Sequence, residues 1–544
     1  MGLNFRRLTF VLFFSAVAGA QGIRPSDINP SINPAPDRRP GEGEGPFDRL
    51  VIRGVTVIDG TGAQPRGPMD IVVEKNRIME VRSVGVPHVA IAERDRPAKG
   101  TKELNATGMY LMPGFIDLHT HTGSAPKAPD AEYVYKLWMA HGVTTVRGVP
   151  SGPMDWTLRE RERSAKNQIV APRMYSYFVP FTGEGWTSPP VITPDVGRQW
   201  VRWAKQKGID GIKLFGDDPE IVAAVLDEGR KLGLGSTAHL SQTYVARLNA
   251  RDAVGLGLGT VTHYYGLFEA LLRDETLQAF PPTQDYNDEQ MRFGEQARIW
   301  NQIYPRGSKQ WNDLLQFFLD HHTVLDPTMT SYVALRDRMR AENAEWLQKY
   351  VLPSLWAYSV PSRTNHATWF YDWTSDDEYH WKKFFQVWMS LIDDYKNMGG
   401  RVTCSTDSFS IWSFYGFSYI QEMELLREAG FTPLEIIRSA TLYPAQALAE
   451  PQGKAIEFGL IRPGLLADMV IVDQNPLANL KVLYGRGTIR LNDQTGNVER
   501  IGGVKYTIKD GIIYDSKKLL ADMAEMVRKQ RQERPLSIGP GAIR

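Results

Sequence analysis

Residues 113–121 read PGFIDLHTH, an apolar run that ends in two histidines, His119 and His121. Side chains along a strand repeat every two residues, so the two imidazoles point the same way at the end of such a strand. They can therefore meet one metal ion. Ten histidines in 544 residues give roughly 0.2 such pairs by chance, so the pair alone is only a moderate signal.

Further β-type runs follow this one, and amphipathic helical stretches separate them. Eight strands with helices between them are what a (β/α)8 barrel, or TIM barrel, needs. A doubly wound sheet is the second possibility, but no glycine-rich phosphate loop follows the first strand. The expected strands are 111–118, 144–149, 174–178, 211–215, 236–238, 260–262, 324–328 and 402–406.

Three more metal-ligand candidates stand where a barrel would need them. His239 closes the run GSTAH, His263 closes GTVTH and Asp407 closes VTCSTD. Each lies at the C-terminal end of an expected strand, the face on which barrel active sites are built. A single residue of this kind is more often structural. Their convergence on one rim, together with the histidine pair, predicts a metal centre.

Lys213 is the unusual residue of the run GIKLF. A charged lysine is costly to bury in an apolar strand, so we expect burial to depress its pKa. One interpretation is that it reaches the rim or pairs with Asp217 or Asp218. The other is that its neutral amine is carboxylated by CO₂, which provides an oxygen ligand for two metals. Spacing leaves both open.

Short β-type runs also stand near both ends of the chain, at 50–52, 55–58, 71–73 and 78–81 and again at 467–472 and 504–508. One small β-sandwich domain built from residues 48–111 and 451–515 explains them, and two unrelated β-caps are the alternative. The barrel then spans residues 112–450. Apolar residues at helical spacing after Asp515 predict a terminal helix within 516–544 that docks one face.

The first twenty residues have the pattern of a secretory signal. Arg6 and Arg7 precede a thirteen-residue apolar run that ends in Ala18-Gly19-Ala20. That run is short for a membrane span, so an uncleaved anchor is the weaker reading. Residues 21–47 are rich in proline and glycine and read as a linker or exposed arm. We expect an exported protein, periplasmic or secreted, without a stable membrane span.

Composition narrows the function classes. Lys plus Arg number 63 against 62 for Asp plus Glu, a net charge of +1 that argues against a general nucleic-acid binder. The single cysteine, Cys404, excludes a disulfide scaffold and cysteine-rich metal sites. Histidines are then the main source of nitrogen ligands. At 42% hydrophobic residues the chain can bury a large core over two to four domains.

The combined motifs resemble the metal-dependent amidohydrolase superfamily, in its imidazolonepropionase and prolidase-like branch. The resemblance covers about residues 48–515 and implies a distorted barrel with a divalent centre, most often two zinc ions. It rests on His239, His263 and the segments 113–121, 142–147, 211–213 and 405–407, with flanking support from 52–60, 439–445 and 459–473.

The resemblance also implies a role for each candidate residue. His119, His121 and Asp407 would hold one ion, His239 and His263 the second, and a carboxylated Lys213 would bridge them. Asp407 would take a proton from a metal-activated water that attacks the amide of a dipeptide or an N-acyl amino acid. Candidate substrate contacts are Arg147, Glu184 and Tyr264.

Several alternatives stay open at this stage. A cyclic amide, an ester or a phosphotriester could be attacked by the same centre. A non-catalytic exported binding protein on a degenerate fold should have lost ligands, and none of the six is missing. Tryptophan-rich insertions at about 265–400 either pack helices or form a substrate lid. The expected partner is a small molecule, and a homo-oligomer is possible.

Overall fold

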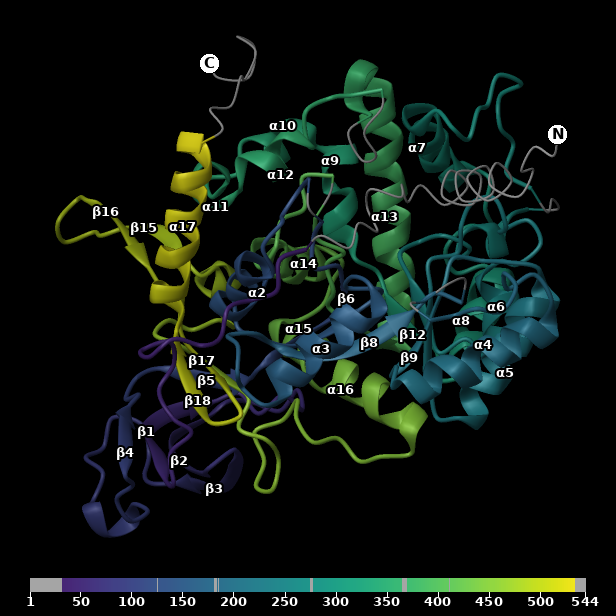
Figure 1. Ribbon diagram of the computed structural model, residues 1–544. Coiled ribbons are helices and arrows are strands. Elements are labelled where there is room, and N and C mark those ends of the chain that lie inside the picture. The colour runs from purple at the N-terminus through teal and green to yellow at the C-terminus, as the bar shows by residue number, and fades with distance from the viewer. Residues whose placement is uncertain are drawn as a thin grey trace.

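The computed structural model describes residues 32–124, 126–180, 183, 185–273, 277–363, 369–409 and 411–533. The expected signal segment, 1–20, lies outside the described residues. A helix-wrapped parallel sheet forms the larger part of the molecule, and a separate β-domain lies beside it (Figure 1).

Eight parallel strands form the barrel sheet and confirm the (β/α)8 class. They are neighbours in the order of the sequence, from β6 to β13. The sheet closes where the chain after β13 meets β6, because the Asp407 N–H donates to the His119 carbonyl over 2.9 Å. The strands are β6 (Phe115–Thr120), β7 (Val143–Gly148), β8 (Arg173–Phe178), β9 (Gly211–Leu214), β10 (Gly235–Ala238), β11 (Thr260–Thr262), β12 (Val324–Asp326) and β13 (Arg401–Val402).

Two predicted strands need correction. The run 111–118 is divided at Gly114, since β5 (Tyr110–Pro113) belongs to the other sheet and only β6 enters the barrel. A Cβ atom at Gly114 would lie 2.1 Å from the Thr144 hydroxyl, so the chain crosses between sheets where only glycine fits. Of the last predicted strand, 402–406, only Val402 lies in a β-strand, β13. Beyond it the Asp117 side chain, and no neighbouring backbone, accepts the Thr406 N–H.

Amphipathic helices cover the barrel, and local sequence explains their limits. Helix α4 (Pro194–Lys207) starts at the cap Thr193, whose hydroxyl accepts the Val196 N–H, and ends at Gly208 with φ of 98°. The other long helices around the sheet are α2 (Ala131–Ala140), α3 (Met154–Ala165), α5 (Pro219–Lys231), α6 (Ala250–Gly255), α8 (Lys309–Asp320), α13 (Ser375–Asn397), α14 (Phe417–Glu428), α15 (Pro433–Ala440) and α16 (Leu442–Ala449).

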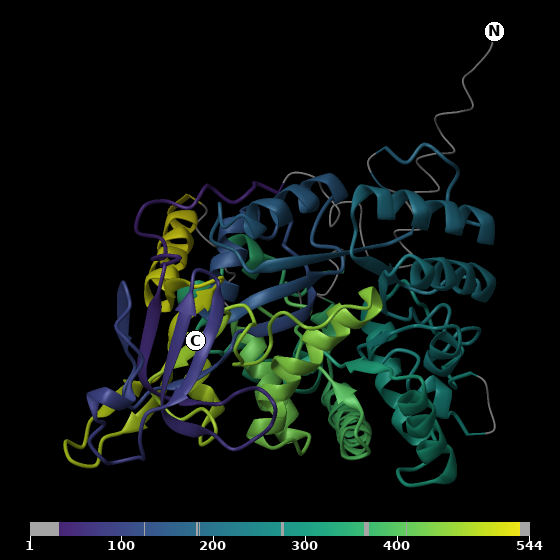
Figure 2. The ribbon, with the colours of Figure 1, turned by 90° about the horizontal axis from the view of Figure 1, so that it is seen from below.

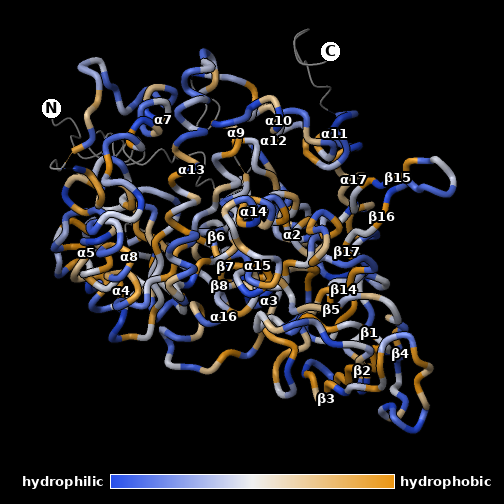
Figure 3. The backbone as a smooth tube through the Cα atoms, turned by 180° about the vertical axis from the view of Figure 1, so that it is seen from behind, coloured by the Kyte–Doolittle hydropathy of each residue, from blue (hydrophilic) through white to orange (hydrophobic). Residues whose placement is uncertain are grey.

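The β-domain is built from both ends of the chain, as predicted. Its strands form one eight-stranded sheet in which β14 runs antiparallel to β5 and joins the two halves. Figure 2 shows the N-terminal strands beside the C-terminal segment, and hydrophobic residues concentrate along β1 to β3 in Figure 3. The strands are β1 (Leu50–Val57), β2 (Arg66–Glu74), β3 (Arg77–Ser83), β4 (Lys102–Asn105), β5, β14 (Met469–Val472), β17 (Val504–Lys509) and β18 (Ile512–Asp515). A separate ribbon, β15 (Thr488–Leu491) and β16 (Val498–Ile501), projects from this side.

The described ends of the chain pack against the body. Helix α17 (Ser516–Glu533) docks on α2 through an apolar face, and the Asp522 carboxylate accepts from Lys136 over 2.6 Å. From residue 32 the proline-rich segment runs over the surface, where Asn33 pairs with Asp130. Its Ile32 side chain is buried, so this part is anchored. No helix of the described chain is both long and apolar enough to cross a membrane.

The insertions around strand β12 form helices that pack through aromatic side chains. Four of the tryptophans there, Trp311, Trp369, Trp381 and Trp388, are fully buried. This favours the packing interpretation for these four. The shorter elements are η3 (Glu269–Leu271), α7 (Glu289–Ala297), η4 (Arg298–Asn301), η5 (Met329–Tyr332), α9 (Val333–Arg336), α10 (Arg338–Glu342), α11 (Leu347–Tyr350), α12 (Pro353–Ala357) and η6 (Phe370–Asp372).

Candidate metal centre

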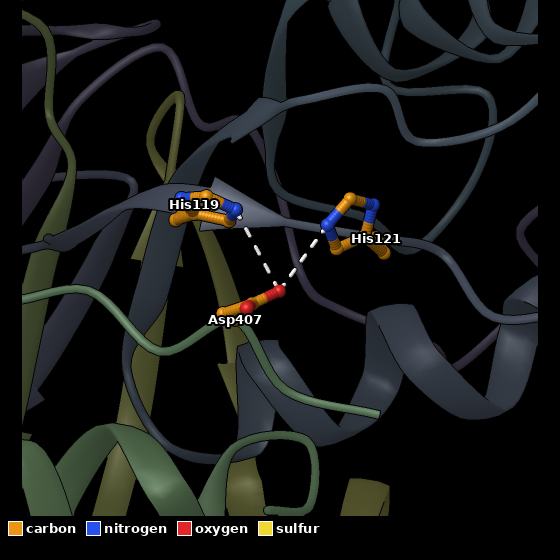
Figure 4. Close-up of side chains that lie close together, drawn as sticks. All are labelled: His119, His121 and Asp407. Carbon is orange, nitrogen blue, oxygen red and sulfur yellow. Dashed lines mark ion pairs between the residues drawn. The ribbon is translucent and has the colours of Figure 1, made fainter. Parts of the chain in front are cut away.

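His119, His121 and Asp407 converge at the C-terminal end of β6 (Figure 4). Asp407 Oδ1 lies 3.2 Å from His121 Nε2 and 3.6 Å from His119 Nε2. One ligand atom from each residue falls within 4.8 Å of the others, the spacing that a single ion could bridge. The histidines belong to β6 and its end, whereas Asp407 follows β13, so barrel closure brings them together.

Two of the histidines are held by hydrogen bonds that select their tautomer. His121 Nδ1 lies 2.8 Å from the Pro150 carbonyl, which can only accept, so Nδ1 carries the proton. His263 Nδ1 lies 2.5 Å from the Thr328 hydroxyl, which itself donates to the Pro327 carbonyl. In both rings Nε2 is therefore left with its lone pair. Such outer partners orient histidine ligands for a metal.

His263 and His239 extend the group across the strand ends. His263 Nε2 lies 3.6 Å from Asp407 Oδ2, and its ring centroid is 4.7 Å from that of His119. The ring centroid of His239 lies 4.7 Å from that of His263. The His239 ring also stacks on Tyr265 at 4.4 Å. All four predicted histidines thus form one continuous set of contacts around Asp407.

Lys213 lies inside β9 with 1% of its surface exposed. Burial lowers the pKa of its ammonium group to about 7, and the negative charge of Asp407 partly opposes this shift. Among the described residues none hydrogen-bonds to its Nζ atom, which lies 5.3 Å from the Phe215 ring centroid. Lys213 therefore neither reaches solvent nor pairs with Asp218, which pairs with Arg247 instead.

The chemistry of these side chains fits a divalent cation. In the described structure His119 Nδ1, His263 Nε2 and Lys213 Nζ are buried without a hydrogen-bond partner. Such atoms cost free energy unless something supplies a partner. Burial also holds the pKa of His119 and His263 well below the usual value, so both rings are neutral as metal ligands must be. Nitrogen and carboxylate oxygen are the donors that zinc prefers.

Buried polar groups support the centre from below. The Asp117 carboxylate accepts from the His119 N–H and from the N–H and hydroxyl of Thr406. Arg147 donates to the Leu118 carbonyl over 2.7 Å and lies 3.4 Å from Asp326. These bonds tie β6 to the chain on both sides of it.

The predicted substrate contacts lie in different surroundings. Arg147 is fully buried in the barrel interior, and Tyr264 is fully buried against Trp381, Phe384 and Trp388 of α13. Both residues have packing contacts, and their contact with a substrate stays a prediction. Glu184 lies outside the described residues.

Several residues near the centre escaped the sequence analysis. The Phe409 ring lies 5.0 Å from His121, and Tyr332 lies 5.6 Å from His263. Tyr265 stands two residues after the ligand candidate His263, and Phe409 stands two residues after Asp407, so the sequence marks both as neighbours of the site. Thr328 carries no such signal, because its contact depends on a backbone with φ of 50°.

A cavity of about 580 Å³ lies at the opposite end of the barrel. It is lined by the start of β8, by α3 and by residues around Phe458, and none of the predicted ligands borders it. The metal centre is thus separate from this cavity.

Comparisons with known proteins agree with this geometry. Residues 386–513 match the amidohydrolase family. The N-acetylglucosamine-6-phosphate deacetylase of Lysinibacillus sphaericus is 26% identical over 240 residues, which are 40% of this chain and 57% of the relative. The chain thus spans little more than half the length of this curated relative.

Solved structures show the same fold. A putative prolidase from Bifidobacterium longum superposes with a TM-score of 0.56 at 19% identity, over 88% of this chain and 99% of that one. A bottromycin amidohydrolase superposes with a TM-score of 0.58 at 17% identity, over 89% of this chain and 91% of that one.

Proposed function

We propose that this chain, which belongs to the amidohydrolase superfamily, is a metal-dependent hydrolase that cleaves a carbon–nitrogen bond of a small molecule. The observation that carries the proposal is the convergence of His119, His121 and Asp407 at one end of the barrel. His263 and His239 adjoin this group through ring contacts.

The ligands divide into two sets. His119, His121 and Asp407 would hold one ion, and His239 with His263 would hold a second. Lys213 would join them after carboxylation, in which its Nζ bonds to the carbon of CO₂ and releases a proton to water. Support for this step is that the buried Nζ has no hydrogen-bond partner among the described residues.

In the proposed reaction Asp407 carries out the proton transfers. A divalent centre bound here would lower the pKa of a water molecule and polarise the substrate carbonyl. Asp407 accepts the proton of that water while the water oxygen bonds to the carbonyl carbon, and it then donates the proton to the leaving nitrogen as the C–N bond breaks. Its side chain is 18% exposed, so water can reach the carboxylate.

We assign the substrate class as a dipeptide or an N-acyl amino acid. Likeness to proteins called a prolidase, an amidohydrolase and a deacetylase supports an amide bond over a phosphotriester. A panel of dipeptides, N-acyl amino acids, chromogenic esters and phosphotriesters tests this assignment. Turnover of amides that a chelator abolishes and zinc restores is the expected result, and turnover of phosphotriesters alone contradicts it.

We also propose that the protein is exported. Support comes from the basic start, the apolar run and the small residues Ala18 and Ala20. The mass of the mature protein from cell fractions tests this, because cleavage after Ala20 removes the first twenty residues. Full-length protein confined to the cytoplasm contradicts it.

A further inference from the structure

Glu422 is a buried carboxylate outside the set of proposed ligands. It lies on α14 with none of its surface exposed. Both of its oxygens accept backbone N–H groups, from Met329 over 3.0 Å and from Thr330 over 2.7 Å. A buried carboxylate is costly unless such bonds satisfy it, so this position is unusual for packing alone.

The two N–H groups belong to the start of the short turn η5. The residue before the turn, Thr328, has φ of 50°, in the left-handed region that a β-branched residue rarely adopts. Such backbone is strained and persists where its surroundings hold it. The Glu422 carboxylate accepts the first two N–H groups of the turn and so holds the backbone that follows Thr328.

The same turn carries two contacts to the metal centre. The Thr328 hydroxyl accepts from His263 Nδ1 over 2.5 Å, which leaves His263 Nε2 as a lone-pair donor. The Ser331 hydroxyl lies 2.7 Å from the Thr406 carbonyl and 3.0 Å from the Asp407 carbonyl, to which it donates. The four-residue segment 328–331 therefore holds the ring of the histidine that follows β11 and the backbone of Asp407 after β13.

We propose that Glu422 is a positioning residue for the metal centre. By holding residues 328–331 it keeps His263 Nε2 and the Asp407 carboxylate at their separation of 3.6 Å. It thereby sets the affinity for the ion that His263 binds. The inference rests on the proposed function only in assuming that these residues bind a divalent ion, because it concerns metal affinity and not the identity of the substrate.

The substitution Glu422→Gln tests this role with little change in volume. The amide has one accepting oxygen, and its NH₂ group faces the second backbone N–H without being able to accept from it. We expect the affinity for the ion that His263 would hold to fall about 10–100-fold, as for other outer-shell partners. Competition with a chromophoric chelator measures this without any substrate.

The matched control is Glu424→Gln on the same helix, whose carboxylate accepts from the Tyr484 hydroxyl over 2.6 Å. This side chain points to a different part of the molecule, so zinc affinity should stay within twofold of the parent. Saturating zinc should restore kcat in Glu422→Gln, which a general loss of folding would not allow.

Ser331→Ala provides a second variant in case Glu422→Gln does not fold. It removes the hydrogen bonds to the Thr406 and Asp407 carbonyls. We expect a smaller loss of zinc affinity, for the ion that Asp407 would hold. If Glu422→Gln folds and both of its zinc affinities are unchanged, the inference is overturned. If Glu422→Gln does not fold, unchanged zinc affinities in Ser331→Ala overturn it. A parent protein that binds zinc but hydrolyses no amide overturns the proposed function and leaves this test intact.

Discussion

Asp407 is placed by constraints that act on both its backbone and its side chain. Its φ is 50°, its N–H donates to the His119 carbonyl, and its carboxylate lies 3.2–3.6 Å from the Nε2 atoms of three histidines. A carboxylate at this point can bind a cation and exchange a proton in the same place. Asp407 and Lys213 are therefore the residues at which single substitutions test the proposed chemistry.

The substitution Asp407→Asn should lower kcat about 10²–10⁴-fold, because an amide cannot accept the proton of the attacking water. KM should change much less, since the proton transfer belongs to the transition state. Steady-state kinetics at saturating zinc measure both. Asp320→Asn, at an exposed position of α8, serves as the control and should retain parental kcat. A parental kcat in zinc-loaded Asp407→Asn would refute the role.

Lys213→Ala should reduce the bound zinc from about two ions per chain to about one, because the bridging oxygens come from the carboxylated amine. Elemental mass spectrometry of the purified variant measures the ratio. The barrel should stay folded, since alanine introduces no charge into β9. If the variant still holds two ions, Lys213 is not a bridge.

Among the elements, the eight barrel strands could be predicted from the sequence to within a few residues, because apolar runs alternate with amphipathic helical stretches. The five His and Asp ligand candidates could be found because each stands at the end of such a run. The sequence analysis missed the division at Gly114, because an unbroken apolar run does not reveal a change of sheet. Thr328 and Glu422 could not be predicted, because their contacts join residues far apart in the sequence. Thr328 binds His263, 65 positions away, and Glu422 binds the Met329 N–H, 93 positions away.

Gly114→Ala tests the crossing between the two sheets. The added Cβ would lie 2.1 Å from the Thr144 hydroxyl, which must shift. We expect a loss of about 1–3 kcal/mol in the free energy of unfolding, the usual cost of overpacking. Denaturant unfolding measures it. Gly85→Ala is the control, because its nearest neighbour would be 3.5 Å away. Equal stability of the two variants would argue against a tight crossing at Gly114.

At the scale of the whole molecule, buried ion pairs join the barrel to the β-domain. Arg173, at the start of β8, pairs with Asp468 beside β14 and donates to Asp510 over 2.6 Å. The Asp468 side chain is 1% exposed. The β-domain is thus joined to the barrel by these ion pairs as well as by the covalent connection from β5 through Gly114 to β6. Periodicity could predict each sheet, but not this contact between residues far apart in sequence.

Arg173→Met should lower the free energy of unfolding by about 3–5 kcal/mol, because it leaves the buried Asp468 carboxylate without its cation, whereas Asp510 keeps Lys509. Thermal and denaturant unfolding measure the loss. Arg490→Met in the exposed ribbon removes the pair with Glu499 and should leave the free energy of unfolding nearly unchanged, because water screens an exposed ion pair. Similar losses in both variants would contradict a joining role for Arg173.

We propose that six residues of the barrel hold two divalent ions. Metal content per chain, measured by elemental mass spectrometry on protein purified without chelator and then supplied with zinc, tests it most directly. The His119→Ala/His121→Ala double variant provides the baseline. The account predicts about two ions in the parent and a clear loss in the double variant. A folded parent that binds no ion, or the same content in both proteins, would contradict it.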